Sequence, residues 1–241
     1  RTPDAHFFTE VRYKGTKTVA ITPDYSEVAK LSDLWLHPKQ GTDAALAMAF
    51  GHVALNEFYF KTRSAYFDDY ARRYTDLPML VLLRSRTLED GRAALVPDRY
   101  IRASDFDGSL DQANHPEWKT IAYDTAGQPV VPNGAIGFRW GDEGRDDAGK
   151  WNLENKDARD GHEVKLKLSL LENADQAPEI ADVAFPYFGG VNSPHFTANA
   201  QQGGINLARV PVARMRLTQD GKAVDALVAT VFDLQAAQYG I

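Results

Sequence analysis

The first 75 residues alternate short apolar runs with segments of helical periodicity. Residues 16–22 (TKTVAIT) form a β-branched run typical of a buried strand, and residues 33–37 (DLWLH) form a second apolar run that stops at Pro38. Between them, residues 25–31 suit a short helix with Asp24 or Ser26 as its cap. Strand–helix–strand order implies two parallel strands joined by a crossover helix, so the pattern predicts an α/β unit.

Two more helices are predicted after the second strand. Thr42 is a natural N-cap for a helix over residues 43–60, which are rich in Ala, Leu, Met and Phe. Because Phe50 and Met48 make different faces of this helix apolar, we expect it to be deeply buried. Residues 64–74 (SAYFDDYARRY) predict another helix, capped by Ser64.

From about Pro78 onward the pattern changes to short β-like runs separated by Asp-Gly, Asn-Gly and Pro-rich turns. The expected runs are residues 79–83, 94–101, 120–123, 134–140, 164–171, 180–188, 210–217 and, as a last strand, 226–234. We therefore expect an α/β fold with three parts. These are a parallel-sheet, Rossmann-like segment over residues 1–77, a β-rich irregular insertion over 78–222, and a strand within 223–241 that returns to the α/β layer.

Charge and cysteine content exclude several classes of protein. The formal net charge is −6 and the basic residues are scattered, whereas binding to nucleic-acid phosphates needs a basic face, so no nucleic-acid partner is expected. The absence of cysteine excludes disulfides, thiolate metal sites and iron–sulfur ligation by this sequence. No apolar run approaches the roughly 20 residues of a membrane helix, so direct membrane insertion is not expected. Because the sequence starts without Met, we expect it to begin inside a longer one.

The end of the first predicted strand carries a candidate binding site made by Thr22, Asp24 and Tyr25. Parallel sheets bind ligands beyond the carboxyl ends of their strands. A carboxylate at that place can accept two hydrogen bonds from a ribose diol, or from the N1–H and exocyclic amine of guanine. The glycine fingerprint G-x-G-x-x-G is absent. The alternative is that Asp24 only caps the following helix.

The end of the second strand carries another candidate site, formed by Lys39, Gln40, Gly41, Thr42 and Asp43. Gly41 permits a positive φ and a close approach of the backbone to a ligand. Thr42 and the N–H groups of the first helical turn can bind a phosphate oxygen, Lys39 adds positive charge, and Asp43 can bind a purine edge. The alternative is an ordinary capped helix entry.

The remaining polar residues give no pattern for catalysis or for a metal site. No two of the six histidines have the spacing of metal ligands on a helix, and we interpret His52 as a hydrogen-bonded core residue. The neighbouring carboxylates of Asp68 and Asp69 diverge on a helix and are interpreted as solvated. We therefore assign no catalytic residue and no metal ligand.

Two adjacent segments carry a family resemblance. Residues 9–36 (TEVRYKGTKTVAITPDYSEVAKLSDLWL) and 37–48 (HPKQGTDAALAM) resemble the molybdopterin enzymes of the dimethyl-sulfoxide-reductase superfamily. In those enzymes a strand that ends in Asp and a later P-x-x-G-T-D-A stretch hold one guanine-dinucleotide arm. Further segments narrow the resemblance to the alpha subunit of respiratory nitrate reductases: 72–79 (RRYTDLPM), 114–121 (NHPEWKTI), 132–140 (PNGAIGFRW), 150–154 (KWNLE), 185–190 (FPYFGG), 230–234 (TVFDL) and 239–240 (YG).

The resemblance implies a parent enzyme that reduces nitrate to nitrite at a molybdenum bis(molybdopterin guanine dinucleotide) centre, with an iron–sulfur cluster nearby. It implies that Thr22, Asp24, Tyr25 and residues 39–43 contact a dinucleotide. Because the family's molybdenum and cluster ligands lie upstream of this segment, we expect the chain alone to bind no cofactor and to be inactive.

The implied partners are the remaining domains of the alpha subunit, an iron–sulfur beta subunit and a membrane haem gamma subunit that takes electrons from quinol. The implied location is the cytoplasmic face of the bacterial inner membrane. Two alternatives remain for the chain: a stand-alone nucleotide-binding module that uses Asp24 and residues 41–43, and a structural or interaction segment whose β-rich part docks onto sister domains.

Overall fold

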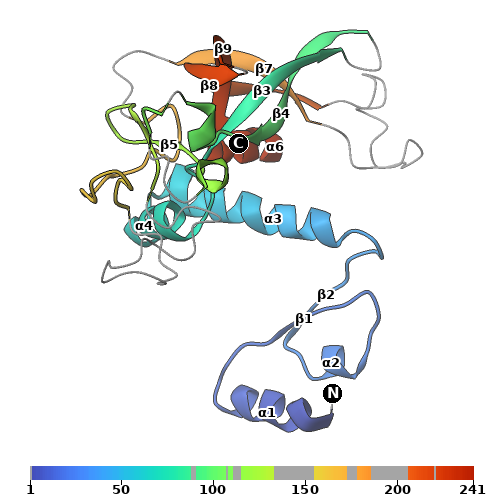
Figure 1. Cartoon of the computed structure of the whole chain (residues 1–241). Helices are drawn as coiled ribbons and strands as arrows, with labels where there is room; N and C mark the ends of the chain where they lie inside the picture. The colour runs from blue at the N-terminus through green and yellow to red at the C-terminus, as the bar shows by residue number, and fades with distance from the viewer. Residues whose placement is uncertain are drawn as a thin grey trace. The chain divides into compact units, whose positions relative to one another are not determined.

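The computed structural model describes residues 2–87, 91–106, 108–110, 115–132, 155–172, 178–185, 206–219 and 221–241 (Figure 1). The chain divides into two compact units, Arg1–Ala54 and Leu55–Ile241. The predicted α/β class is confirmed in its coarse form, because the chain combines helices, a small parallel sheet and a five-stranded barrel. The Rossmann-like sheet stays a prediction, since the parallel sheet described has two strands.

The first unit is built around two parallel strands, β1 (Val19–Ile21) and β2 (Leu34–Leu36). Helix α2 (Glu27–Lys30) connects them, as the strand–helix–strand pattern predicted. Helix α1 (Thr2–Tyr13), which the sequence analysis did not predict, precedes them.

A side-chain hydrogen bond fixes the start of this sheet. The Asp33 carboxylate accepts from the Thr18 backbone N–H at 2.8 Å and from the Thr18 hydroxyl at 2.9 Å. These two bonds, together with the Arg12 guanidinium at 3.2 Å, hold the pKa of Asp33 below its usual value. The contact ties the end of α1 to the entry of both strands.

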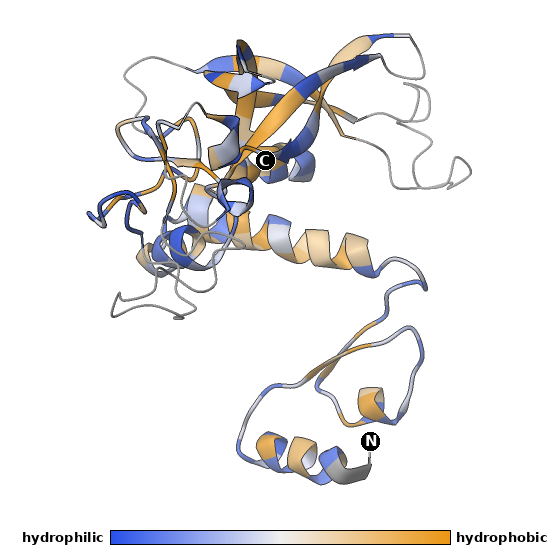
Figure 2. Cartoon of the chain, in the orientation of Figure 1, coloured by the Kyte–Doolittle hydropathy of each residue, from blue (hydrophilic) through white to orange (hydrophobic). Residues whose placement is uncertain are grey.

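Helix α3 (Asp43–Leu55) continues as the π-helix η1 (Asn56–Lys61), so the predicted helix over residues 43–60 is confirmed in extent. The prediction that it is deeply buried is wrong for this chain. Leu55 is its one buried residue, whereas Phe50 and Val53 are 51% and 54% exposed. Figure 2 shows the hydrophobic colours that run along α3. Apolar sequence predicted a core position, but the described part of this chain does not supply the cover.

The second unit contains helix α4 (Ala65–Tyr74), followed by a closed barrel. The Ser64 side chain accepts from the Phe67 backbone N–H at 3.4 Å, so the predicted N-cap of α4 is confirmed. The barrel strands, in order around it, are β3 (Leu80–Thr87), β4 (Ala93–Tyr100), β7 (Glu179–Phe185), β8 (Asn206–Gln219) and β9 (Lys222–Thr230).

The barrel is mixed, since β4 and β7 pair in parallel and the other neighbours pair antiparallel. Strand β9 closes it by pairing with β3, where Leu80 lies opposite Thr230. Beside it, β5 (Ala122–Tyr123) and β6 (Pro129–Val130) form a two-stranded sheet. The short 3-10 helices η2 (Ala103–Asp105) and η3 (Pro116–Trp118) lie in the connection that precedes β5.

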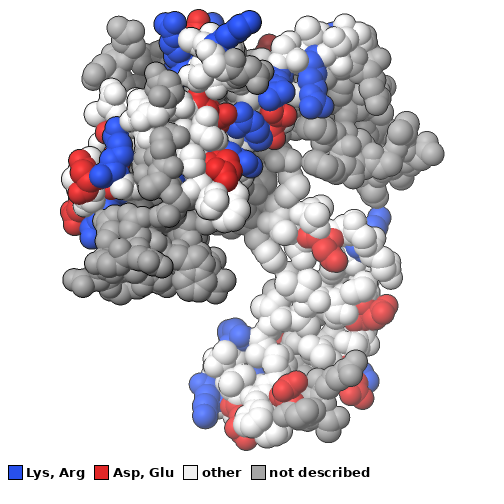
Figure 3. Space-filling model, viewed as in Figure 1, with Lys and Arg blue, Asp and Glu red and all other residues white. Residues whose placement is uncertain are grey.

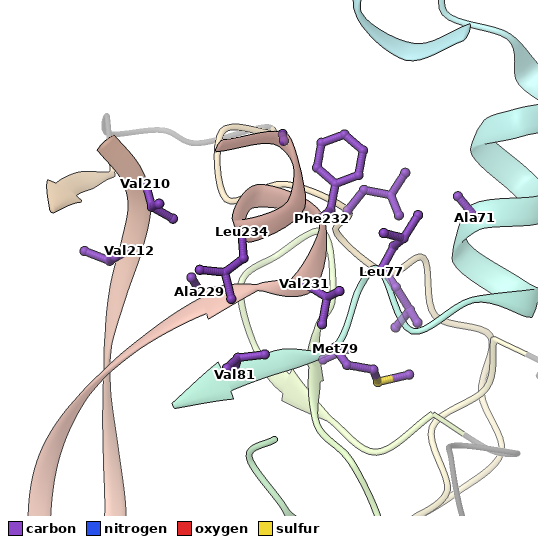
Figure 4. Packing of buried hydrophobic residues seen from close by; sticks show 14 of the residues in the cluster. Ala71, Leu77, Met79, Val81, Val210, Val212, Ala229, Val231, Phe232 and Leu234 are labelled. Carbon is purple, nitrogen blue, oxygen red and sulfur yellow. The ribbon is translucent and has the colours of Figure 1, made fainter. Parts of the chain in front are cut away.

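The first half of β3, residues 80–83, is buried on both faces, whereas residues 84–87 are exposed. Leu80 and Leu82 belong to one hydrophobic cluster, and Val81 and Leu83 belong to another. Successive side chains of a strand point to opposite faces, so a run without polar residues fits a strand covered on both sides. Figure 4 shows the second of these clusters, in which β3 and β9 residues meet Phe232 and Leu234.

The last predicted strand, over residues 226–234, is wrong in its second half. Strand β9 stops at Thr230, and helix α6 (Val231–Tyr239) begins there. The Thr230 hydroxyl accepts from the Asp233 backbone N–H at 3.0 Å, which is an N-cap that outweighs the β-branched character of Val231. Among the described strands, β9 pairs with β3 and β8, and not with β1 or β2.

The other predicted β-runs have mixed outcomes. Residues 79–83, 94–101 and 210–217 match β3, β4 and β8, while residues 120–123 and 180–188 match β5 and β7 in part. Residues 164–171 form only an isolated bridge, at Leu166, and are otherwise not a strand. Residues 134–140 lie outside the described residues, as does the end of the run 180–188.

Candidate functional site

Both predicted binding segments leave the parallel sheet at the same edge. In the register of β1 and β2, Ile21 lies opposite Leu36. The Thr22 N–H donates to the Leu36 carbonyl at 3.2 Å, and the Trp35 indole N–H donates to the Thr22 carbonyl at 2.9 Å. These bonds hold the first residue after β1 against the end of β2, which is the edge where parallel sheets bind ligands.

The segment after β1 presents an exposed carboxylate beside an aromatic cluster. The Asp24 side chain is exposed, and its backbone N–H donates to the Thr22 hydroxyl at 3.4 Å. The Tyr25 ring lies edge-on to Trp35 with 5.1 Å between centroids, and Trp35 lies 4.9 Å from the His37 ring. Ser26 occupies the N-cap position of α2, so the alternative in which Asp24 is that cap is not supported.

The segment after β2 is a turn that leads into α3. Gly41 has a φ of 77°, a left-handed conformation in which an added Cβ would meet nothing within 4 Å. The Thr42 hydroxyl donates to the Lys39 carbonyl at 2.6 Å, and the Thr42 carbonyl accepts from Leu46. Thr42 thus lies at the N-cap position, but its hydroxyl is used within the turn. The N–H groups of the first helical turn remain as the donors for a ligand.

The side chains of this turn face solvent. Lys39, Gln40 and Asp43 are exposed, and Thr42 is half-buried. The basic and acidic groups of the two segments thus lie near one sheet edge and are open to solvent. The two described pockets, of about 490 and 710 Å³, are lined by residues of the second unit. In the described ranges, no group of three His, Asp or Glu side chains has the arrangement of a metal site.

A buried charged cluster that the sequence pattern does not predict lines the smaller pocket. Arg72 is 4% exposed and its guanidinium binds Asp68 at 3.0 Å and Glu172 at 2.9 Å, while also donating to the Leu166 carbonyl. Arg63 binds the same two carboxylates. The prediction that Asp68 is solvated is therefore wrong, and only the i,i+4 spacing of Asp68 and Arg72 signalled the pairing.

The electrostatics of this cluster favour a fixed set of charges. Burial opposes ionisation of Glu172, but hydrogen bonds from Tyr59 and Arg63 and the charge of Arg72 hold its pKa below the usual value. Burial, and then the bond to Glu172 at 2.7 Å, raises the pKa of the Tyr59 hydroxyl. Because each charge has a partner, the cluster suits a structural joint better than an acid–base pair.

Charged side chains of both signs lie on the face of the molecule shown in Figure 3. On the face shown in Figure 3, basic and acidic side chains of the described residues are interspersed. In the described residues no helix is both long and apolar enough to cross a bilayer.

Comparison with known proteins adds the decisive observation. The chain is 56% identical over 241 residues to the respiratory nitrate reductase 1 alpha chain of Escherichia coli (strain K12). It aligns throughout with a segment of the respiratory nitrate reductase alpha chain. The nitrate reductase alpha chain of Bacillus subtilis (strain 168) is 37% identical over 243 aligned residues. The family resemblance carried by the sequence motifs is thus confirmed.

The match covers all of this chain but only 18% of the length of the Escherichia coli alpha chain and 17% of the Bacillus alpha chain. A shorter match, 35% identical over 145 residues and 59% of this chain, joins it to the perchlorate reductase subunit alpha of Dechloromonas aromatica (strain RCB). No protein-family model matches the chain.

Proposed function

We propose that this chain is a cofactor-binding and scaffold segment of a respiratory nitrate reductase alpha chain. In this proposal the whole enzyme reduces nitrate to nitrite at molybdenum bis(molybdopterin guanine dinucleotide), and this segment forms part of the wall that holds one guanine-dinucleotide arm. The observation that carries the proposal is the parallel register of β1 and β2, because it brings both candidate segments to one sheet edge.

The residues at this edge fit a guanine nucleotide. The exposed Asp24 carboxylate offers two acceptor oxygens for the N1–H and amine of guanine. Tyr25 and Trp35 present aromatic surface next to it for a purine ring. The left-handed Gly41 and the first turn of α3 offer backbone N–H groups to a phosphate, with Lys39 adjacent. Thr22, Gln40, Thr42 and Asp43 complete the proposed contact set.

Bound cofactor supplies the two-electron chemistry at molybdenum, and this chain's role is to bind and orient its nucleotide tail. Asp24 and the turn over residues 39–43 lie on neighbouring loops, so they grip a long ligand at two points and fix its direction. No residue of the chain is proposed as catalytic. For this reason the chain alone is proposed to be inactive and free of cofactor.

The match to a perchlorate reductase alpha subunit supports a role in the scaffold rather than in substrate choice. That protein is 35% identical to this chain over 145 residues and is named for another oxyanion. A segment with relatives in two reductases of different name is better suited to a scaffold than to the recognition of nitrate.

The partners are proposed on the same basis. The rest of the alpha chain would extend the two-stranded parallel layer into a Rossmann-like sheet and supply the metal ligand and the iron–sulfur cluster. An iron–sulfur beta subunit and a membrane haem gamma subunit would deliver electrons from quinol at the cytoplasmic face of the inner membrane.

The proposal is tested with the full-length alpha chain that contains this segment. Asp24→Asn keeps the size of the side chain but removes an acceptor and the charge, a loss of about 1.5–3 kcal/mol per hydrogen bond. We expect roughly tenfold or greater loss of bound guanine nucleotide and molybdenum per polypeptide, measured after gel filtration. Asp182→Asn, at an exposed position on β7, is the control. Equal nucleotide content in both variants would contradict the proposal.

The stand-alone alternative gives a different result. If the chain is a nucleotide-binding module by itself, the 241-residue protein binds GMP or GDP at micromolar concentration without a pterin. We expect no such binding, because the side chains of Asp24, Lys39 and Asp43 are exposed to solvent in this chain. Isothermal titration with GMP and GDP separates the two cases.

A further inference from the structure

Helix α3 exposes apolar side chains on opposite sides. Met48 and Phe50 are 37% and 51% exposed, and Val53 is 54% exposed. Residues two positions apart on an α-helix lie about 200° apart around the axis, so Met48 and Phe50 face nearly opposite ways. Phe50 and Val53, three positions apart, lie on one side. The exposed apolar surface therefore wraps around the helix instead of forming a single stripe.

The sequence of α3 lacks the polar face that a solvent-exposed helix normally has. Its thirteen residues are DAALAMAFGHVAL, in which Asp43 and His52 are the only ionisable side chains. Surface helices of globular proteins have an apolar stripe and a polar face, whereas a helix that is apolar all round lies inside a core. Exposed aromatic residues continue into η1, where Phe58 and Phe60 are 52% and 47% exposed.

The geometry decides which occupant fits. A separate subunit or a second copy of the chain approaches from one side and covers one face of a helix. Two opposite faces need polypeptide on several sides. The alpha chains that match this sequence are much longer, since the match spans 18% of the Escherichia coli protein, so most of such a chain lies outside these 241 residues.

We propose that α3 is an internal helix of the full-length alpha chain, enclosed by the polypeptide that lies outside this 241-residue segment. The proposal rests on the assignment of this chain to such an enzyme. Enclosure would also hold the first turn of α3 in a fixed position. The helix begins at Asp43, directly after the Lys39–Thr42 turn, and ends at Leu55, which is buried in the barrel's core cluster. Enclosing α3 fixes the direction of the first-turn N–H groups that the proposed dinucleotide contact uses.

Photocrosslinking in the full-length, assembled enzyme tests this enclosure. A photoreactive phenylalanine analogue replaces Phe50, and the cross-linked peptides are sequenced by mass spectrometry. We expect cross-links to peptides of the same polypeptide from outside the 241 residues. Cross-links to another subunit or to a second copy, or a failure to cross-link, would overturn the proposal. Tyr66 on α4, 79% exposed, is the comparison position.

A second measurement uses charge. Phe50→Lys in the full-length chain is expected to lower the yield of folded, protease-resistant alpha chain at least tenfold, whereas Tyr66→Lys leaves it within twofold. Equal yields for the two variants would contradict enclosure of α3. The result is separable from the nucleotide assignment, because Asp24→Asn tests ligand content in a folded chain, and α3 can be enclosed whether or not that loop binds a nucleotide.

Discussion

Arg72 and Glu172 form a buried ion pair, with 2.9 Å between Arg72 Nη2 and Glu172 Oε1, although 100 positions separate them in the sequence. The pair attaches helix α4 to the connection that precedes β7, and Glu172 Oε2 also accepts from the Leu168 backbone N–H at 3.0 Å. The Glu172 carboxylate thus connects helix α4 to the loop that contains Leu168, and it also lines the smaller pocket. Such a joint is expected to govern stability and not chemistry.

Replacing Arg72 should therefore destabilise the second unit strongly. Arg72→Met leaves Glu172 buried with Arg63 as its remaining cation and leaves the Leu166 carbonyl without that donor. Breaking a buried pair costs about 3–5 kcal/mol, and the presence of Arg63 places the expected loss near the lower end, about 3 kcal/mol. Urea unfolding followed by circular dichroism measures it.

The adjacent residue supplies a matched control. Arg73 makes the same i,i+4 pair with Asp69 at 2.6 Å, but these side chains are 43% and 60% exposed. Exposed helix pairs of this kind contribute about 0.3–0.5 kcal/mol. Arg73→Met should thus lower the free energy of unfolding by less than about 1 kcal/mol. Similar losses for the two variants would show that the buried cluster is not a joint.

Asp233 makes the stability of the chain depend on pH. Burial raises the pKa of its carboxyl to about 6, against hydrogen bonds from the Leu170 N–H, the Ser169 hydroxyl and the Thr230 hydroxyl. A carboxyl whose pKa is higher in the folded state than its ordinary value of 3.8 favours folding when protonated. This contribution is complete below about pH 4 and is lost as pH rises to about 6.

The variant Asp233→Asn should lose that dependence. The destabilisation that it causes, relative to the unsubstituted chain, is expected to shrink by roughly 2–3 kcal/mol between pH 4 and pH 7. Carboxylates of lowered pKa, such as Asp68 and Glu172, make the chain less stable as the pH falls. Both proteins contain these carboxylates, so comparing the two proteins at each pH removes their effect. Urea unfolding at several pH values is the measurement, and a constant difference would contradict the assignment.

Two glycines of the first unit have left-handed backbone, and substituting each of them distinguishes backbone strain from the loss of a ligand contact. Gly41 and Gly15 have φ values of 77° and 85°, and an added Cβ meets nothing within 4 Å at either. Alanine at each position should cost about 1–2 kcal/mol of stability, because the left-handed backbone is strained for residues with a Cβ. Only Gly41→Ala should also lower the guanine-nucleotide content of the full-length chain. Equal content in both variants would remove the turn from the contact set.

The local parts of the fold could be predicted from sequence, and the long-range parts could not. Within residues 16–37, apolar and β-branched runs predict the two strands, and the prolines that follow each run predict where the strands end. Ser64 predicts the start of α4 because it is a favoured N-cap residue. Barrel closure depends on Leu80 facing Thr230, a pairing that no local pattern specifies. Residues 226–234 are apolar enough for a strand, and the Thr230–Asp233 cap decides otherwise in their second half.

The candidate site was only partly predictable for the same reason. The end of each parallel strand is a local feature, so the sequence could place both segments at one edge of the sheet, whereas the ligand that they bind stays a proposal from the family resemblance. The cluster around Arg72 depends on Glu172, which lies 100 positions away in the sequence. The sequence therefore indicated only the i,i+4 pair of Asp68 and Arg72. The expected burial of residues 43–60 failed because burial belongs to the surroundings as well as to the helix.

The most direct test is amide hydrogen exchange of the full-length alpha chain with and without bound cofactor. We expect the amides of Asp24 and Tyr25 and those of the turn from Gly41 into α3 to become protected together when the dinucleotide binds. Protection confined to segments elsewhere, with unchanged exchange at both of these loops, would contradict the claim that this sheet edge holds the nucleotide.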